Sequence, residues 1–450
     1  MKLMTRDKEF YKQFFALYWV LVLHNVIILG VNLADNIMIG SYSETSLAGV
    51  AAVNQIQFIF QQIILGSGNA LVILSSQYWG QNRTDEIKRI SLSAMITGVG
   101  AGVLLFTAAA ITPDGIVGLF SPTKAIIEQG AEYLRIIKYT YVVFAMTNIL
   151  LATLRSTETV KIGFYISLST LIINCSINYL LIEGRFGFPE LGVTGAAIGT
   201  LTARIVELIA VICYIAFVDK KLRIRLKEYF KFDKKLFGDY FRLGRSIVIV
   251  DALFGVSTAL QSVILGHMSD SAIAANAVST SLYQTLKVMS VGACSATAVI
   301  IGKTIGAGAM DKIKEYTKTL QIMFLIIGAV LATLLFVIRI PILEMYNLSE
   351  ETRYYANAFI LVLCVAGFGM SYQMPTCCGI VRGGGDAKFV LKNDLISIWL
   401  IVLPVSYLAA FVFEWSPIIV VFCLNADQIF KCGAAFFKVN SYTWIKKLTR

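Results

Sequence analysis

The sequence is poor in charged residues and in histidine. Asp, Glu, Lys and Arg together make up 15% of the 450 residues, against about 25% in a typical soluble protein, whereas hydrophobic residues make up 57%. The chain has only two histidines, His24 and His267, and its eight cysteines do not have the spacing of a zinc site. A soluble protein this apolar could not cover its surface with polar groups, and metal chemistry would lack its usual ligands.

Signatures of catalysis and of nucleotide binding are also missing. Residues Gly302 to Thr304 resemble the end of a phosphate-binding loop, but the first glycine of such a loop would stand where the chain has Thr297. No Ser-His-Asp or Cys-His arrangement stands out, so we predict a protein that is not an enzyme and holds no cofactor. The net charge of +11 lies in short connectors without clustered exposed aromatic residues, which argues against nucleic acid as a partner. No feature indicates an obligate protein partner.

Most of the sequence consists of long apolar runs separated by short polar connectors. A helix needs roughly 20 residues to cross the hydrocarbon core, and a lone strand would leave its backbone groups unpaired in lipid. We therefore predict an all-α integral membrane protein with twelve transmembrane helices that contact membrane lipid. The expected spans are 14–39, 48–78, 92–112, 133–153, 162–183, 194–218, 244–266, 273–302, 319–338, 355–380, 390–413 and 416–438. Basic residues concentrate in alternate connectors, so the positive-inside rule places both termini in the cytoplasm.

The chain also repeats itself. One constant shift aligns Gly40 with Gly266 and Asp85 with Asp311 without a gap. The same shift aligns Ser43 with Ser269, Gly66 with Gly292 and Gly80 with Gly306. Each copy has an even number of spans, which predicts parallel repeats that form two pseudo-symmetric six-helix lobes. We assign 1–218 to an N-lobe, 219–243 to a cytoplasmic basic linker, and 244–450 to a C-lobe with a cytoplasmic tail. Folds of this kind commonly bind a substrate between their halves, which makes transport the leading hypothesis.

Three segments, in this order and at this spacing, resemble the multidrug and toxic compound extrusion (MATE) family. The segment Ala34 to Gly40 (ADNIMIG) is similar to the first-helix signature of the family. Leu191 to Ala197 (LGVTGAA) resembles the entry to its sixth helix, and Val381 to Asp386 (VRGGGD) resembles the turn after its tenth. The resemblance implies an antiporter of the bacterial cytoplasmic membrane, which exports small organic compounds, often cationic drugs, in exchange for inward H⁺ or Na⁺.

The resemblance also implies which residues couple transport to the ion. The acidic residue that is central to coupling in the family falls on Asp35, and Na⁺ at Asp35 is the only metal ion that we expect. The other coupling candidates are Asn148, Asn174, Asn178, Thr200 and Asp251. Many relatives have Asp where this chain has Asn178, so a cation site here would be weaker or would rely more on neutral oxygens. The choice between Na⁺ and H⁺ stays open.

Each ionisable side chain within a span needs a partner or a task, because burying it in hydrocarbon costs at least about 2.5–3.5 kcal/mol. For Asp35 we favour a carboxylate that binds Na⁺ or exchanges a proton over one that is simply paired with a donor. His24 lies on the same helix face and either lines the same cavity or hydrogen-bonds between helices. Asn174 and Asn178 are four residues apart, so their oxygens suit a hard cation and equally suit hydrogen bonds between helices.

The remaining polar residues of the spans form a second set of candidates. Arg204 and Glu207, three residues apart, are most simply a mutual ion pair. Lys287, Asp251 and Asp427 are candidates for a second charged network. Gln55 and Tyr283 would contact a substrate in the cleft or pack between helices. Acids outnumber bases within the spans, which suits a cationic substrate; the alternative is a flippase or exporter of a lipid-linked or other specific metabolite, for which a more basic cleft is expected.

Overall fold

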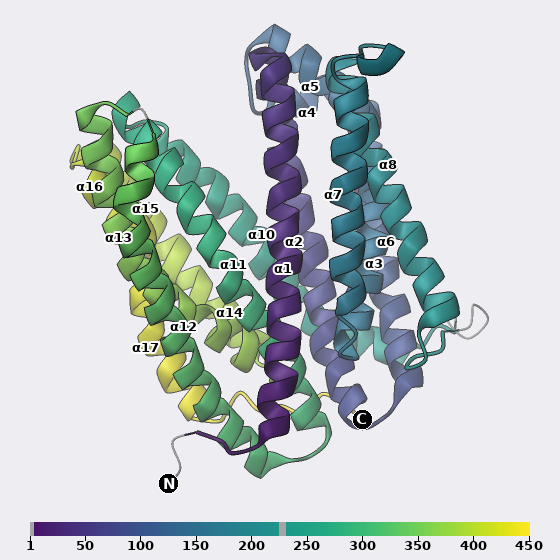
Figure 1. The fold of residues 1–450 in the computed structure, drawn as a ribbon. Helices are drawn as coiled ribbons and strands as arrows, with labels where there is room; N and C mark the ends of the chain where they lie inside the picture. The colour runs from purple at the N-terminus through teal and green to yellow at the C-terminus, as the bar shows by residue number, and fades with distance from the viewer. Residues whose placement is uncertain (1–3, 225–230, 347) are drawn as a thin grey trace. The chain divides into compact units, whose positions relative to one another are not determined.

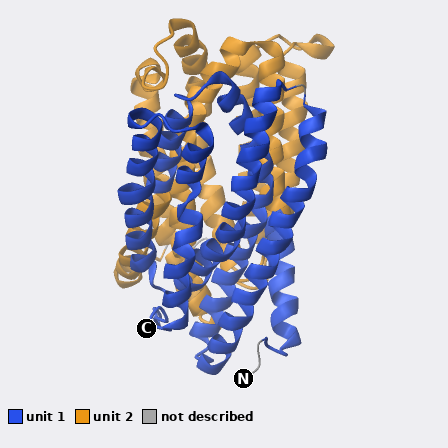
Figure 2. Ribbon diagram, turned by 90° about the vertical axis from the view of Figure 1, so that its left-hand side faces the viewer, with its two compact units in different colours: residues 1–22, 253–450 blue, residues 23–252 orange. Residues whose placement is uncertain are grey.

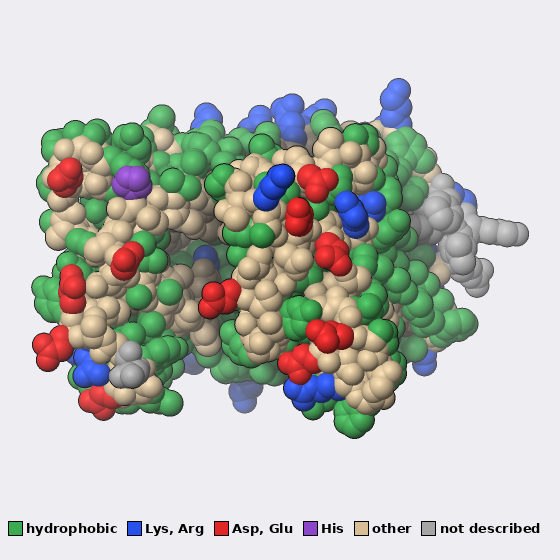
Figure 3. All heavy atoms as spheres, turned by 90° about the horizontal axis from the view of Figure 1, so that it is seen from above, with side chains coloured by type: hydrophobic (Ala, Val, Ile, Leu, Met, Phe, Trp, Pro, Cys, Tyr) green, Lys and Arg blue, Asp and Glu red, His purple; other side chains and the backbone are tan. Residues whose placement is uncertain are grey.

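The computed structural model of the chain describes residues 4–224, 231–346 and 348–450, and within them it contains helices and no strands (Figure 1). Eleven of these helices are long and apolar enough to cross a membrane, and a bent pair raises the number to twelve. The prediction of an all-α membrane protein with twelve spans is confirmed. Large apolar side chains such as Leu104 and Phe217 are exposed. Figure 3 shows hydrophobic side chains on the surface in one view, among scattered charged ones.

The helices of the first half are α1 (Lys8–Tyr42), α2 (Glu44–Gly80), α3 (Thr84–Ile111), α4 (Pro113–Gly118), α5 (Lys124–Ile137), α6 (Tyr139–Ser156), α7 (Lys161–Leu181) and α8 (Gly192–Cys213). Those of the second half are α10 (Lys234–Leu265), α11 (Asp270–Gly306), α12 (Met310–Met345), α13 (Glu350–Met374), α14 (Ala387–Asp394), α15 (Leu403–Tyr407), α16 (Pro417–Asn425) and α17 (Asp427–Asn440). A short 3₁₀ turn, η1 (Arg185–Gly187), and the π-helical segments η2 (Tyr214–Val218), η3 (Pro375–Val381), η4 (Leu395–Val402) and η5 (Leu408–Val412) complete the described elements.

The fourth predicted span, 133–153, is not one straight helix. It crosses the junction of α5 and α6, which are bent by 50° to one another. Both helices pack on α2, and Tyr133 of α5 and Tyr141 of α6 belong to the same buried cluster. The bend brings α5 into the core of this half, where it also contacts α8.

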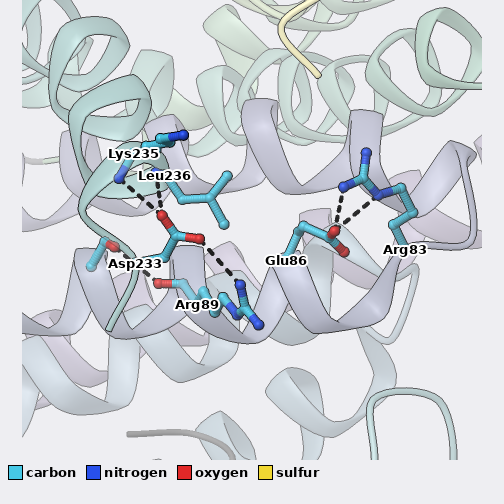
Figure 4. A network of polar contacts seen from close by, with 7 residues as sticks. Arg83, Glu86, Arg89, Asp233, Lys235 and Leu236 are labelled. Carbon is cyan, nitrogen blue, oxygen red and sulfur yellow. Dashed lines mark hydrogen bonds and ion pairs between the residues drawn. The ribbon is translucent and has the colours of Figure 1, made fainter. Parts of the chain in front are cut away.

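A capping acid sets the beginning of α10. The Asp233 carboxylate accepts hydrogen bonds from the backbone N–H groups of Lys235 (2.9 Å) and Leu236 (3.2 Å), which would otherwise lack partners at a helix start (Figure 4). Its other oxygen accepts from Arg89 of α3 at 3.1 Å. Arg83, which directly precedes α3, pairs with Glu86 in the first turn of that helix. Residues 234–243, which we assigned to the linker, are therefore helical; residues 225–230 of that linker lie outside the described part of the chain.

The chain forms two compact units (Figure 2). Unit 2 comprises residues 23–252, and unit 1 comprises residues 1–22 and 253–450. The boundaries between the units fall inside α1 and α10. The first part of α1 belongs to unit 1, and the first part of α10 belongs to unit 2. The lobes that we assigned from the sequence follow chain order instead, with boundaries at 218 and 244.

Two glycines at equivalent positions of the internal repeat allow the first parts of α10 and α1 to pack closely within these units. A Cβ on Gly66 of α2 would lie 3.0 Å from Val248 Cα of α10. A Cβ on Gly292 of α11 would lie 2.5 Å from Val22 Cγ2 of α1. The internal repeat aligns these two glycines with each other, so it preserves a close helix contact in each unit.

The repeat also fixes where α2 and α11 begin and end. Each is 37 residues long. Ser43 caps α2 by accepting from the backbone N–H of Ser46, and Ser269 caps α11 by accepting from that of Ala272. The internal repeat therefore aligns the N-cap residue of α2 with the N-cap residue of α11.

Candidate ion and substrate site

A small polar cavity lies within unit 2, between α1, α2, α5, α7 and α8. Its volume is about 40 Å³, which gives room for an ion or a few water molecules and not for a drug-sized molecule. Its polar lining consists of Asn32, Asp35, Asn36, Asn54, Gln57, Tyr133, Thr170, Asn174, Thr200 and Arg204. Four of the residues that we singled out from the sequence, Asp35, Asn174, Thr200 and Arg204, thus line one cavity.

A chain of amide hydrogen bonds joins the helices around this cavity. Asn178 of α7 donates through Nδ2 to Asp35 Oδ1 of α1 at 2.7 Å and to Asn174 Oδ1 at 3.4 Å. Asn174 in turn donates to Thr200 Oγ1 of α8 at 3.2 Å. Asn174 and Asn178 are buried. Asp35 is thereby connected to α8 through two side chains of α7.

Two glycines of α8 allow α7 to approach closely enough for this chain. A Cβ on Gly195 would lie 2.7 Å from the carbonyl oxygen of Leu181, and one on Gly199 would lie 2.1 Å from Asn178 Oδ1. Figure 1 shows α7 and α8 side by side. The Asn178 carboxamide fills the space that a side chain at position 199 would take, and its Oδ1 has no hydrogen-bond partner among the described residues.

Asp35 and Arg204 are the two charged side chains of the cavity lining. Within the described residues Asp35 has no ion-pair partner, whereas Arg204 Nη1 donates to Glu207 Oε2 at 2.8 Å. This is the pairing that their spacing predicts. Glu207 lies outside the lining and is 5% exposed, so the pair compensates its own burial. The Asp35 carboxylate accepts a hydrogen bond from the Asn178 amide at 2.7 Å.

The structure places two further candidates away from the cavity lining. His24 Nδ1 lies 2.8 Å from Ser167 Oγ and 3.2 Å from the carbonyl oxygen of Gly163, so the ring links α1 to α7. This is the interhelical alternative that the sequence left open. Asn148 donates through Nδ2 to the carbonyl oxygen of Phe144, one turn earlier on its own helix, at 3.0 Å.

The polar stretch of α2 contributes to the cavity in part: Gln55 is exposed, whereas its neighbours Asn54 and Gln57 line the cavity. Two further lining residues, Thr170 and Tyr133, were not among our candidates. Thr170 lies one turn before Asn174, so the helical period could have identified it. Tyr133 belongs to α5, and no local signal indicates that the bend after Ile137 directs this helix to the site.

The remaining candidates lie elsewhere in the two units. Asp251 belongs to unit 2, where it accepts a hydrogen bond from Asn69 at 3.2 Å. Lys287 belongs to unit 1, with its ammonium 5.1 Å from the centre of the Phe254 ring. The buried Tyr283 donates through its hydroxyl to the sulfur of Met370 at 3.1 Å.

Asp427 has an ion-pair partner that was not among our candidates. Lys431 Nζ lies 3.1 Å from an Asp427 oxygen and 2.7 Å from an Asp394 oxygen. Lys431 is 4% exposed within α17 and adds a base to those that we counted in the spans. The network that we expected around Asp427 is therefore centred on Lys431 in this unit.

A metal cluster of the usual kind is not formed by the described residues, since no three His, Cys, Asp or Glu side chains are close enough to hold an ion. Na⁺ at Asp35 would rely on neutral oxygens of neighbouring Asn and Thr side chains, which are ligands that hard cations accept.

Comparison with known proteins gives consistent results. The family model MatE matches residues 21–180 and 247–408. The probable multidrug resistance protein YoeA of Bacillus subtilis is 25% identical over 368 residues, which cover 80% of this chain and 78% of that protein. The probable multidrug resistance protein NorM of Thermotoga maritima is 22% identical over 434 residues, with 95% and 92% covered.

The fold is also that of solved transporters. The crystal structure of a point mutant of the Vibrio cholerae MATE transporter VcmN matches with a TM-score of 0.87 at 17% identity, over 97% of this chain and 98% of that one. The match extends across both units, and the family model covers most of the chain. The protein is therefore a multi-pass membrane protein and belongs to the MatE family of transporters.

Proposed function

We propose that this transporter is a secondary active antiporter that exports small organic compounds of the multidrug type in exchange for inward H⁺ or Na⁺. The observation that supports it most is the environment of Asp35. It is the one acid in the lining of the cavity, has no ion-pair partner among the described residues, and is hydrogen-bonded to α7. A proton or Na⁺ at this carboxylate neutralises the charge of the site.

Coupling follows from that neutralisation. An ion shifts a conformational equilibrium only if it binds the two conformations with different affinity. Binding at Asp35 changes the acceptor of the Asn178 amide, and the hydrogen-bond chain through Asn174 carries this change to Thr200 of α8. Occupancy of Asp35 thereby biases alternating access between inward-open and outward-open states.

The location that goes with this function is the bacterial cytoplasmic membrane, with both termini in the cytoplasm and with lipid around the apolar helix faces. Both ends of the described chain lie at the same end of unit 1, which supports an even number of spans (Figure 2). The relatives named above are bacterial proteins called multidrug resistance proteins, which supports small organic molecules as substrates.

The test is export of ethidium from reconstituted vesicles under separately imposed pH and Na⁺ gradients. Wild type is compared with Asp35→Asn and with the control Asp114→Asn, which removes an exposed carboxylate from the same unit. We expect wild type and Asp114→Asn to exchange ethidium for one of the two ions, and Asp35→Asn to lose exchange while it remains monodisperse.

Two results would overturn the proposal. If Asp35→Asn exchanges ethidium at the wild-type rate, Asp35 does not couple transport. If neither gradient moves an organic cation through wild type, the alternative of a lipid-linked or other specific metabolite becomes the next hypothesis, and vesicles with labelled lipid-linked substrates test it.

A further inference from the structure

The second charged residue of the cavity lining, Arg204, has hydrogen-bonding capacity that the described part of the protein does not use. We propose that Arg204 binds the carboxylate of the substrate, so that the transporter prefers zwitterionic organic compounds whose cationic group faces Asp35. This inference rests on the proposed function and specifies its substrate class.

The first observation is the free edge of the guanidinium. A guanidinium carries five N–H donors in a planar fork. Within the described residues, the one hydrogen bond of Arg204 runs from Nη1 to Glu207 Oε2, and its positive charge lies 5.2 Å from the centre of the Phe144 ring. The Nε and Nη2 donors have no acceptor in that part of the chain. This is the edge that binds a carboxylate with two parallel hydrogen bonds.

The second observation is the burial of the two partners. The Arg204 side chain is 18% exposed and lines the cavity, whereas the Glu207 side chain is 5% exposed and does not line it. Glu207 therefore holds the guanidinium from the protein side and fixes its orientation. Arg204 and Asp35 line the same cavity.

The third observation is the charge of the lining, which is one carboxylate and one guanidinium. Glu207 compensates the charge of Arg204, so a ligand that carries only a positive charge would be attracted by Asp35 but would leave the free edge of Arg204 without an acceptor. A ligand with an ammonium and a carboxylate complements both groups. At about 40 Å³ the cavity has room for the charged groups of a ligand rather than for all of it.

The experiment compares two forms of one dye: a rhodamine with a free benzoate carboxylate and the methyl ester of the same rhodamine. The ratio of their KM values for export from reconstituted vesicles measures recognition of the carboxylate. The variants are Arg204→Lys, which keeps the charge and loses the fork, and the double variant Arg204→Gln/Glu207→Gln, which leaves neither buried charge without its partner. Binding of both dyes to the solubilised proteins is measured in parallel by fluorescence anisotropy.

We expect wild type to prefer the acid over its ester by about tenfold, which corresponds to one charge-assisted hydrogen-bonded contact. The double variant should show a ratio near one, and Arg204→Lys an intermediate ratio. If Arg204 only holds α8 in place, both dyes are affected equally and the ratio stays at its wild-type value.

An unchanged ratio in the double variant, or a wild type that does not distinguish the two dyes, would overturn the inference. If the proposed antiport function is wrong, the result differs: neither the pH gradient nor the Na⁺ gradient drives export of either dye. In that case the anisotropy measurement still decides on Arg204, because binding requires no ion gradient.

Discussion

Asn178 donates its side-chain amide to the carboxylate of Asp35 over 2.7 Å, although the two residues are 143 positions apart in the chain. The contact joins α1 to α7 at the cavity of unit 2. It depends on Gly199 of α8, because any larger residue there would occupy the position of the Asn178 carboxamide. Three helices therefore meet at one carboxylate.

The first prediction concerns Gly199→Ala. The new methyl group would displace the end of the Asn178 side chain, which can move without refolding the backbone but then loses Asp35. Loss of one charge-assisted hydrogen bond, about 1.4 kcal/mol, predicts about a tenfold drop in ion-driven exchange. Vesicle transport measures this drop, and the free energy of unfolding should fall by a similar amount, about 1.4 kcal/mol.

The control for this prediction is Gly100→Ala, since a Cβ on Gly100 meets nothing within 4 Å. Asn178→Ala should lower exchange as much as Gly199→Ala does, and the two changes together should lower it no further, because they remove the same interaction. Additive losses would mean that Gly199 acts independently of Asn178.

The second prediction concerns Asn69, which connects two charged residues of unit 2. It donates to Asp251 at 3.2 Å and accepts from Arg155 Nη2 at 3.1 Å. Asn69→Leu removes both hydrogen bonds at similar volume and should lower the free energy of unfolding by about 1–3 kcal/mol. Thermal unfolding in detergent measures the loss.

Gln62→Leu on the same helix is the matched control, because the Gln62 side chain makes no hydrogen bond to the described residues. Equal unfolding temperatures for both variants would contradict the bridging role of Asn69. Asp251→Asn addresses the coupling role that we predict for Asp251: it keeps an acceptor for Asn69, so a loss of ion-driven exchange in this variant would report the charge itself.

The third prediction concerns the pH dependence of a contact outside the spans. Asp386 accepts from Lys438 and Lys446, both at 2.8 Å. Burial alone would raise the pKa of Asp386, but the hydrogen bonds and charges of the two lysines outweigh it and hold the pKa below its ordinary value. The native state thus favours the carboxylate. Its contribution to stability is present above the ordinary pKa of about 3.9 and is lost as the pH falls through the lower native value.

We therefore expect Asp386→Asn to unfold at a lower temperature than wild type near neutral pH, with a difference that shrinks as the solution is acidified towards pH ~3. Asp270→Asn, which changes an exposed carboxylate of the same unit, should show no such trend. A difference between Asp386→Asn and wild type that is independent of pH would exclude the carboxylate charge as its source.

Asp386 belongs to a turn that the end of the chain covers. Trp444 is fully buried against Gly384, where a Cβ would lie 2.1 Å from the indole ring. Its indole N–H donates to the carbonyl oxygen of Val439, and the Lys446 backbone N–H donates to that of Gly384, both at 2.8 Å. The Gly-rich turn, which resembles a family motif, thus packs against Trp444 and Lys446 near the end of the chain.

The sequence by itself determined the features that depend on local or repeated patterns. Apolar runs of sufficient length specify membrane helices, because lipid leaves the backbone no other partner. The internal repeat specified matching caps at Ser43 and Ser269. The spacing of Arg204 and Glu207 specified their ion pair, since residues three apart on a helix are neighbours. Asp35 was identified as an acidic residue within a membrane span, where charged side chains are costly.

Only the tertiary structure decided which polar faces meet. Asn178 contacts Asp35, and Lys431 contacts Asp394, because a buried polar group takes the partner that long-range packing places beside it. The bend between α5 and α6 directs Tyr133 to the cavity, and the rotation of α2 exposes Gln55 while Gln57 lines the site. Helical periodicity defines the faces of each helix, but the neighbour of each face is set by packing between segments far apart in the sequence.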